Sequence, residues 1–213
     1  MLWMSGDEAG NGTVHDLSSH LNDGTITGGT AWNMLPDGTW YLTLNGDTGL
    51  VNFGNDVSLQ PTNAFTIVMW LKPNTLVNWD AILGKTTSGG WNNGFGAYAY
   101  SGALRFWVNW YQTTGVTTPP LTPGAWQQVV LTFNKDLPSS NLQCFINGAA
   151  GSSRNYTSPV TATPGNFFFG DTHGTGLNYR YDGSMAMLRV FNTAWTVAEV
   201  QSSFNAEKAR FGL

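Results

Sequence analysis

The strongest constraint on the fold is a series of short apolar segments separated by residues that favour turns. Several segments alternate apolar and polar residues, and almost no part of the chain has a helical period. Many short strands joined by turns indicate two packed antiparallel sheets, an all-β fold. We expect strands at Tyr41–Leu44, Phe65–Leu71, Leu104–Tyr111, Trp126–Phe133, Leu142–Ile146, Asn166–Phe169 and Met185–Phe191.

Turn signals lie between these segments, because Gly and Asn tolerate the positive φ that tight turns require. They are Asn45-Gly46-Asp47, Gly89-Gly90, Pro123-Gly124, Asn147-Gly148 and Asp182-Gly183. Within Leu104–Tyr111 the side chains alternate between two faces. One face is predicted to carry Leu104, Phe106, Val108 and Trp110, and the other Arg105, Trp107, Asn109 and Tyr111.

One helix is predicted near the end of the chain, over Ala194–Phe204. Thr196 and Glu199 fit a capping box, and Trp195 with Val200 fits the hydrophobic staple that fixes the entry into a helix. We expect this helix to be short and peripheral. No internal repeat or Pro/Ser-rich linker divides the sequence, so residues 1–213 are interpreted as a single domain.

The composition argues against several classes of partner. Nine Lys plus Arg face thirteen Asp plus Glu with no basic run, which argues against nucleic acid, because a polyanion needs clustered cations. The longest apolar stretch, Phe65–Leu71, is far shorter than the ~20 residues that cross a bilayer, so membrane insertion is not expected. The single cysteine, Cys144, lies in an apolar run and is predicted to be a buried small hydrophobe.

Several different short motifs follow one another along nearly the whole chain in a characteristic order. They are Leu2–Gly10, His15–Ser19, Asn22–Thr25, Phe65–Pro73, Gly124–Trp126, Phe145–Gly148, Phe169–Gly170 and Asp182–Asn192. This order resembles the laminin-G-like jelly-roll modules of the concanavalin A-like lectin/glucanase superfamily, whose central strand reads "FT…W.KP". The resemblance implies a two-sheet antiparallel jelly-roll β-sandwich with one short C-terminal helix.

Catalysis by a carboxylate pair is not expected. Glycosidases that resemble this chain place their carboxylates on one strand, commonly as Glu-x-Asp-x-x-Glu, because one group attacks while the other donates a proton. The glutamates here are Glu8, Glu199 and Glu207, and none lies in such a motif. The three histidines fit no nucleophile or zinc motif and are expected in loops or turns. The chain is therefore predicted not to be an enzyme.

Calcium is the stronger metal candidate, because hard cations take carboxylate and amide oxygens from loops. The resemblance suggests a site at the sandwich edge. The oxygen-bearing residues that would form it are Asp7, Asp16, Asn22, Asp23 and Asp182. Relatives often carry an acidic residue in an "I-D-E-V-R" string of the late strand, where this chain has Ala186. We expect no required cofactor and keep Ca²⁺ as an alternative.

Glycan binding requires aromatic faces that stack on sugars and polar groups that orient them. Two regions qualify: the segment from Trp79 to Tyr98 with the polar face of Leu104–Tyr111, and the loop Asp171–Tyr179. Aromatic residues also fill cores and subunit interfaces, an alternative left open for Trp91 and Tyr111. Trp70, Trp126 and Phe133 are assigned to the core. The candidate ligand-binding residues are Trp79, Trp91, Asn92, Asn93, Trp107, Asn109, Tyr111, Asp171, His173 and Tyr179.

The leading interpretation is a non-catalytic carbohydrate-binding or adhesion module that recognises a surface glycan or another surface ligand. The alternatives are a structural decoration or assembly protein, contacting a second copy or capsid and tail proteins, and a fragment of a larger secreted protein. No export signal is visible near Met1. Because such modules act outside cells, we expect an extracellular setting and take display on a bacteriophage virion as a hypothesis.

Overall fold

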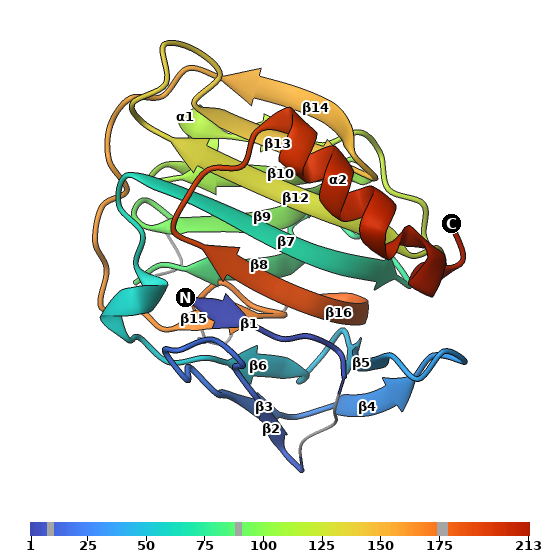
Figure 1. Ribbon diagram of the computed structural model, residues 1–213. Coiled ribbons are helices and arrows are strands. Elements are labelled where there is room, and N and C mark those ends of the chain that lie inside the picture. Colours follow the sequence, from blue (N-terminus) through green and yellow to red (C-terminus); the bar gives the residue numbers. More distant parts are fainter. Residues whose placement is uncertain (8–10, 88–90, 174–178) are drawn as a thin grey trace.

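Two sheets pack face to face in the computed structural model, which describes residues 1–7, 11–87, 91–173 and 179–213 (Figure 1). Sheet A contains, in spatial order, β14 (Ala149–Arg154), β13 (Leu142–Ile146), β12 (Gln127–Asn134), β7 (Ala64–Pro73), β16 (Asp182–Phe191), β5 (Trp40–Asn45) and β4 (Thr30–Met34), with β1 (Leu2–Trp3) paired to β16. Sheet B contains β11 (Val116–Thr117), β10 (Ala103–Val108), β9 (Phe95–Tyr100), β8 (Ala81–Lys85), β15 (Phe167–Phe169), β6 (Leu50–Asn52), β3 (Gly24–Thr27) and β2 (Thr13–Val14). Neighbouring strands within each sheet pair antiparallel, so the predicted all-β sandwich is confirmed.

The predicted strands are all present, and their ends agree within two residues except at two ends, which differ by three. Strand β10 stops at Val108, because Asn109 adopts a φ of +62° and a short helix, α1 (Tyr111–Thr114), follows. Trp110 is therefore exposed, at 51%, and does not share the core face as the alternation predicted. The predicted Asp182-Gly183 turn is instead the first part of β16, which begins three residues before the apolar run that starts at Met185.

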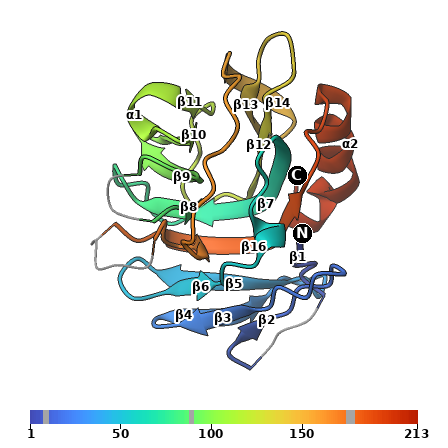
Figure 2. The same ribbon diagram turned by 90° about the vertical axis from the view of Figure 1, so that its left-hand side faces the viewer.

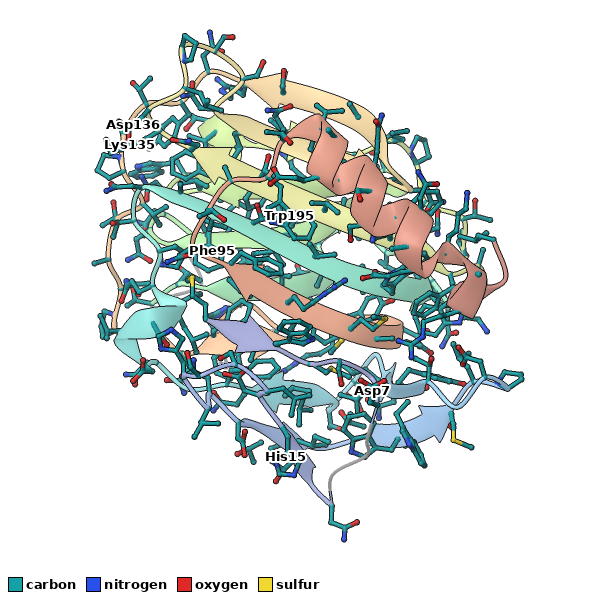
Figure 3. The ribbon with its side chains drawn as sticks, viewed as in Figure 1. Asp7, His15, Phe95, Lys135, Asp136 and Trp195 are labelled. Atoms are coloured by element: carbon teal, nitrogen blue, oxygen red, sulfur yellow. The ribbon has the colours of Figure 1, made fainter. Side chains whose placement is uncertain are left out.

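In the described residues, buried hydrophobic side chains form a main core between the sheets and smaller clusters on the outer faces of both sheets. Phe133 and Phe95 lie between the sheets, and Figure 3 labels Phe95 in this interior. Trp70 and Trp126 are buried as predicted, but they belong to a separate cluster on the outer face of sheet A. Cys144 is also buried, which raises the pKa of its thiol to about 12 and agrees with its interpretation as a small hydrophobe.

The C-terminal helix α2 (Val197–Glu207) covers the outer face of sheet A, on the opposite side of the molecule from α1 (Figure 2). Its capping box is present as predicted: the Thr196 side chain accepts from the N–H of Glu199, whose carboxylate accepts in return from the N–H of Thr196. Trp195, labelled in Figure 3, packs against the cluster that contains Val200. In the described residues, no helix has the length and apolarity needed to cross a bilayer.

The end of α2 is not peripheral, which corrects the expectation from the sequence. The Glu207 carboxylate is buried and forms an ion pair with Arg189 of β16. It also accepts a hydrogen bond from the indole N–H of Trp70 at 2.7 Å and one from the amide of Gln128 at 3.1 Å. This network fixes the helix to three strands, and the 3₁₀ turn η2 (Lys208–Phe211) then stacks Phe211 on Trp70.

A lysine is buried on the inner face of sheet B. Lys85 of β8 lies opposite Phe95 of β9 and Phe167 of β15. Its Nζ donates a hydrogen bond to the carbonyl oxygen of Gly165 at 2.6 Å. Removing the ammonium from water disfavours its charged form. Burial therefore lowers the pKa of Lys85 from its usual 10.5 to about 8, although the charge of Asp56 acts in the opposite direction.

We expect the stability of the wild type to rise relative to that of Lys85→Met between about pH 8 and pH 10. In this window the unfolded chain still binds the lysine proton while the folded chain has released it, so a higher pH favours folding. Below it both states are protonated and the full burial cost remains. Urea denaturation of both proteins across this range measures the difference, whose slope cannot exceed about 1.4 kcal/mol per pH unit.

The pairwise comparison removes other titrations, because Cys144 and the buried tyrosines are the same in both proteins. Parallel stability curves for the wild type and Lys85→Met would contradict the lowered pKa of Lys85.

Candidate functional site

Aromatic side chains gather on the face of sheet B that points away from the core. In β9, Ala97 and Ala99 face the core, so the alternation turns Tyr98 and Tyr100 outward. In β10, Phe106 is in the core and Trp107 is on the outer face. We call the aromatic residues in contact there the aromatic cluster: Trp79, Trp91, Tyr98, Tyr100, Trp107 and Tyr111.

The rings of the aromatic cluster interlock. Trp79 stacks on Tyr98, with centroids 5.2 Å apart and planes 13° apart, and Trp91 stacks on Trp107 at 6.3 Å and 8°. Tyr111 meets Trp79 and Trp91 edge-on, at interplanar angles of 78° and 80°. Offset-stacked and edge-to-face pairs are the favourable aromatic geometries. Each ring is therefore held in place by at least one other ring.

Backbone contacts fix the loop that presents Trp79. Trp79 has a φ of +80°, and its N–H donates to the carbonyl oxygen of Ala99 on β9 at 2.8 Å. The carboxyl group of Asp80 accepts from the N–H of Val77 at 2.9 Å and closes the turn. Burial raises the pKa of this carboxyl group, with the charge of Asp182 adding to the effect. The turn that carries the indole is therefore closed by Asp80 and bonded to β9 through the backbone of Trp79.

Exposure separates the aromatic cluster into a floor and an outer layer. Trp107, Tyr98 and Trp91 are buried, with exposed fractions of 0%, 1% and 4%, whereas Trp79 is 36% and Tyr100 37% exposed. Tyr111 is half-buried. Trp91 and Trp107 were predicted to contact a ligand, but their rings support the layer above them. The rings open to solvent are those of Trp79 and Tyr100.

The predicted asparagines have different surroundings. Asn109 is buried, donates to the Tyr156 hydroxyl and the Pro159 carbonyl oxygen, and accepts from the N–H of Thr161, so it secures the 156–161 segment rather than facing a ligand. Asn93 is engaged with the side chains of Thr86 and Thr87. Asn92 is exposed beside Trp91.

The second predicted region adjoins the first. Ala81, two residues after Trp79, donates its N–H to the carbonyl oxygen of Tyr179. Its backbone also forms an isolated parallel β-bridge with Arg180. Tyr179 is 41% exposed, and its backbone lies beside the start of β8. Residues 174–178 of this loop lie outside the described residues.

The other two predicted residues of that loop are inward-facing. Asp171 forms an ion pair with Arg180 at 2.9 Å and accepts from the N–H of Thr172, while the His173 ring contacts the Thr172 hydroxyl. Burial lowers the pKa of His173, although the charge of Asp171 raises it. This arrangement holds the loop against sheet B, since a Cβ at Gly84 would meet Thr172 at 2.9 Å.

The sequence model of the concanavalin A-like lectin/glucanases superfamily (Laminin_G_3) matches residues 45–201. The chain belongs to this superfamily. No protein of curated function matches the sequence significantly. The match includes both segments that build the aromatic cluster and the whole of β16.

Solved structures with the same fold come from several kinds of protein. Domain 4 of the extracellular arabinanase AbnA from Geobacillus stearothermophilus, solved with arabinotriose, has a TM-score of 0.73 and 18% identity over 94% of this chain and 96% of its own. A botulinum neurotoxin type C structure has a TM-score of 0.73 and 15% identity, over 97% of this chain and 50% of its own. A Trypanosoma rangeli sialidase mutant has a TM-score of 0.70 and 16% identity, over 100% of this chain and 33% of its own. This chain therefore spans half or less of the toxin and sialidase chains, and at these identities the likeness concerns the fold.

In this superfamily member, the candidate calcium ligands do not converge. Asp16 bonds to β1, whose Trp3 pairs with Arg189 of β16, whereas Asp182 lies seven residues earlier on β16, roughly 20 Å along the strand. Asp7 forms an ion pair with Arg210 near the C-terminus. Among the described residues, no group of three or more His, Cys, Asp or Glu is arranged to hold a metal.

Asp16, Asn22 and Asp23 do lie together, but the oxygens of the two aspartates already accept hydrogen bonds, and the Asn22 amide donates to Met1 and Ser58. The buried Asp16 carboxylate accepts from the N–H groups of Trp3, Ser18 and Asn22. Asp23 accepts from the N–H of Asp16 and contacts His15. These hydrogen bonds connect the two carboxylates to the backbone of the N-terminal segment. Ala186, which occupies the acidic position of relatives, is buried beside Trp70.

We expect calcium at millimolar concentration to leave the melting temperature unchanged. A ligand of the native state stabilises by RT ln(1 + [L]/Kd), and the oxygens of Asp16 and Asp23 already accept protein hydrogen bonds. Thermal melts with calcium and with a chelator test this. A rise in melting temperature that disappears in Asp23→Ala would establish a calcium site.

Sequence reasoning missed Tyr100 as part of this surface, and it placed Tyr98 and Arg105 in the region without naming them as candidate binding residues. The alternation within β9 would have placed both tyrosines on one face, but the small residues between them concealed the strand. The described strands of sheet B contain no Asp or Glu at all. The aromatic surface is therefore suited to stacking and hydrogen bonding, and it offers no carboxylate pair from its strands.

Proposed function

We propose that this chain is a non-catalytic carbohydrate-binding module whose ligand stacks on Trp79. The observation that carries the proposal is a partly exposed indole held on a floor of buried aromatic rings. One face of Trp79 covers Tyr98, so its exposed third lies on the remaining surface of the ring. A ring fixed in this way loses little conformational entropy when a sugar binds.

The surroundings of Trp79 fit a sugar better than an entirely apolar ligand. Tyr100 and Tyr179 present partly exposed aromatic surface with hydroxyl groups, and Asn92 and Gln112 provide exposed amides. Amides and hydroxyls orient a ligand while the rings contribute apolar burial. The arabinanase domain was solved with arabinotriose, and the toxin structure is described in terms of ganglioside interaction, which supports a glycan as the ligand class.

Binding without hydrolysis is supported by the acidic residues. Asp80, next to the exposed indole, closes a turn, and Asp171 forms an ion pair with Arg180. In the described residues both carboxylates are engaged inside the fold, whereas a glycosidase presents two carboxylates to an open site. An extracellular setting fits this proposal, since the arabinanase of similar fold is extracellular.

The test is a glycan array followed by titration calorimetry on the best ligand, with Trp79→Ala compared to Trp3→Ala. Trp3 is a matched control, because it is 46% exposed but lies on β1 of sheet A. We expect Trp79→Ala to weaken binding by about 1–3 kcal/mol and Trp3→Ala to leave it unchanged.

An array without any hit, or equal affinity of Trp79→Ala and the wild type, would overturn the proposal. A change of oligomer size in Trp79→Ala, measured by light scattering, would instead favour a subunit interface at this surface.

A further inference from the structure

A guanidinium group lies next to the aromatic cluster. Arg105 of β10 pairs across the strands with Tyr98, so both side chains are on the outer face of sheet B. Its Cζ lies 5.7 Å from the centre of the Tyr100 ring, and that ring is 6.3 Å from Trp79. Arg105 is thus adjacent to Tyr98 and Tyr100, two of the three tyrosines that contact the exposed indole.

The position of Arg105 is built into the fold. Its side chain passes over Gly115, where a Cβ would lie 2.2 Å from Nε, so any larger residue would displace it. One side is covered by the Tyr100 ring in a cation–π contact. The guanidinium is therefore positioned between a glycine and an aromatic ring before any ligand arrives.

The hydrogen-bonding capacity of Arg105 is largely unused. Nη2 makes one long contact with the carbonyl oxygen of Gln112, at 3.4 Å, and the buried Nε has no acceptor. Within the described ranges, no carboxylate forms an ion pair with Arg105. By contrast, Arg180, Arg189 and Arg210 each pair with an aspartate or glutamate.

An arginine of this kind matches one ligand chemistry. The planar guanidinium offers parallel N–H donors that fit a carboxylate in a bidentate manner. The strands of sheet B contribute no acidic group that would repel such an anion. We propose that Arg105 is a specificity-determining residue that binds the carboxylate of an acidic sugar stacked on Trp79, an inference that rests on the proposed function. The carboxylate can come from a hexuronic acid or from a sialic acid.

The experiment uses two matched pairs of probes: trigalacturonic acid with its methyl ester, and sialyllactose with lactose. Affinities are measured by calorimetry for the wild type, Arg105→Gln, Arg105→Lys and Trp79→Ala. We expect the wild type to bind at least one acidic probe about tenfold more tightly than its neutral partner. The pair that shows the difference identifies the source of the carboxylate.

Arg105→Gln is expected to abolish this preference, so that the ratio of the acidic to the neutral affinity falls from about tenfold to about one. Arg105→Lys should restore only part of it, because lysine keeps the charge but lacks the planar fork. Near-ultraviolet circular dichroism of each variant verifies that the aromatic cluster is intact.

The outcomes separate this inference from the proposed function. Equal affinity for acidic and neutral probes, lost in Trp79→Ala but not in Arg105→Gln, overturns the role of Arg105 and leaves the carbohydrate-binding proposal standing. A preference for acidic probes that survives in Arg105→Gln also overturns the inference. Failure of all four probes together with an empty glycan array overturns both.

Discussion

Replacing Glu207 with alanine is expected to lower the free energy of unfolding by about 3–5 kcal/mol. The carboxylate is buried under the last turn of α2 and pairs with Arg189, so its removal leaves a buried guanidinium without its counter-ion. The indole N–H of Trp70 loses its acceptor at the same time. A buried group left unsatisfied costs far more than the pair contributes when it is complete.

Urea denaturation measures this loss, with Gln201→Ala as the matched control. Gln201 is an exposed position of the same helix, so its replacement should change stability by no more than about 0.5 kcal/mol. A loss below about 1 kcal/mol in Glu207→Ala would mean that α2 is a peripheral helix, as its short amphipathic sequence suggests.

The long strands could be predicted from the sequence because their side chains alternate or are continuously apolar. Strands β7 and β12 occupy the centre of sheet A, and their apolar runs mark them directly. Strand β9, by contrast, reads Phe-Gly-Ala-Tyr-Ala-Tyr, and β8 includes a glycine and a lysine. Such residues disfavour strands locally, so these two strands exist because of their pairing partners.

The location of the aromatic surface was predictable, but its exposed rings were not. Trp79, Trp91, Trp107 and Tyr111 were identified as a group from their clustering in the sequence, and the structure brings them into contact. The burial of Trp107 depends on Gly96, because a Cβ at that position would lie 2.9 Å from the Trp107 ring and leave it no room.

The mispredictions of Asn109 and of the acidic residues have other physical reasons. The positive φ of Asn109 turns its amide inward, and no sequence period reports a single backbone dihedral. Aspartates that look like calcium ligands in the sequence also form Asx turns, and Asp16 uses its oxygens in this way. The expectations of an assembly role and of display on a virion stay predictions.

The second large effect is expected for Trp107→Ala, which should lower the free energy of unfolding by about 3–5 kcal/mol. Trp107 is fully buried on the outer face of sheet B, lies over Gly96 and stacks on Trp91. Removing the indole leaves a cavity beneath Trp91 and Tyr98 that neighbouring strands cannot fill by collapse.

Trp79→Ala is the matched comparison, because both changes remove an indole from the same aromatic cluster. The Trp79 side chain is already 36% exposed, so it buries less apolar surface than Trp107 does. Trp79→Ala should therefore lower the free energy of unfolding clearly less than Trp107→Ala. Denaturation midpoints of both variants, measured beside their glycan affinities, assign the roles: Trp107 to the floor and Trp79 to the ligand. Equal losses of stability in the two variants would show that Trp79 is also a structural ring, and the binding surface would then have to lie at Tyr100, the other exposed ring of the aromatic cluster.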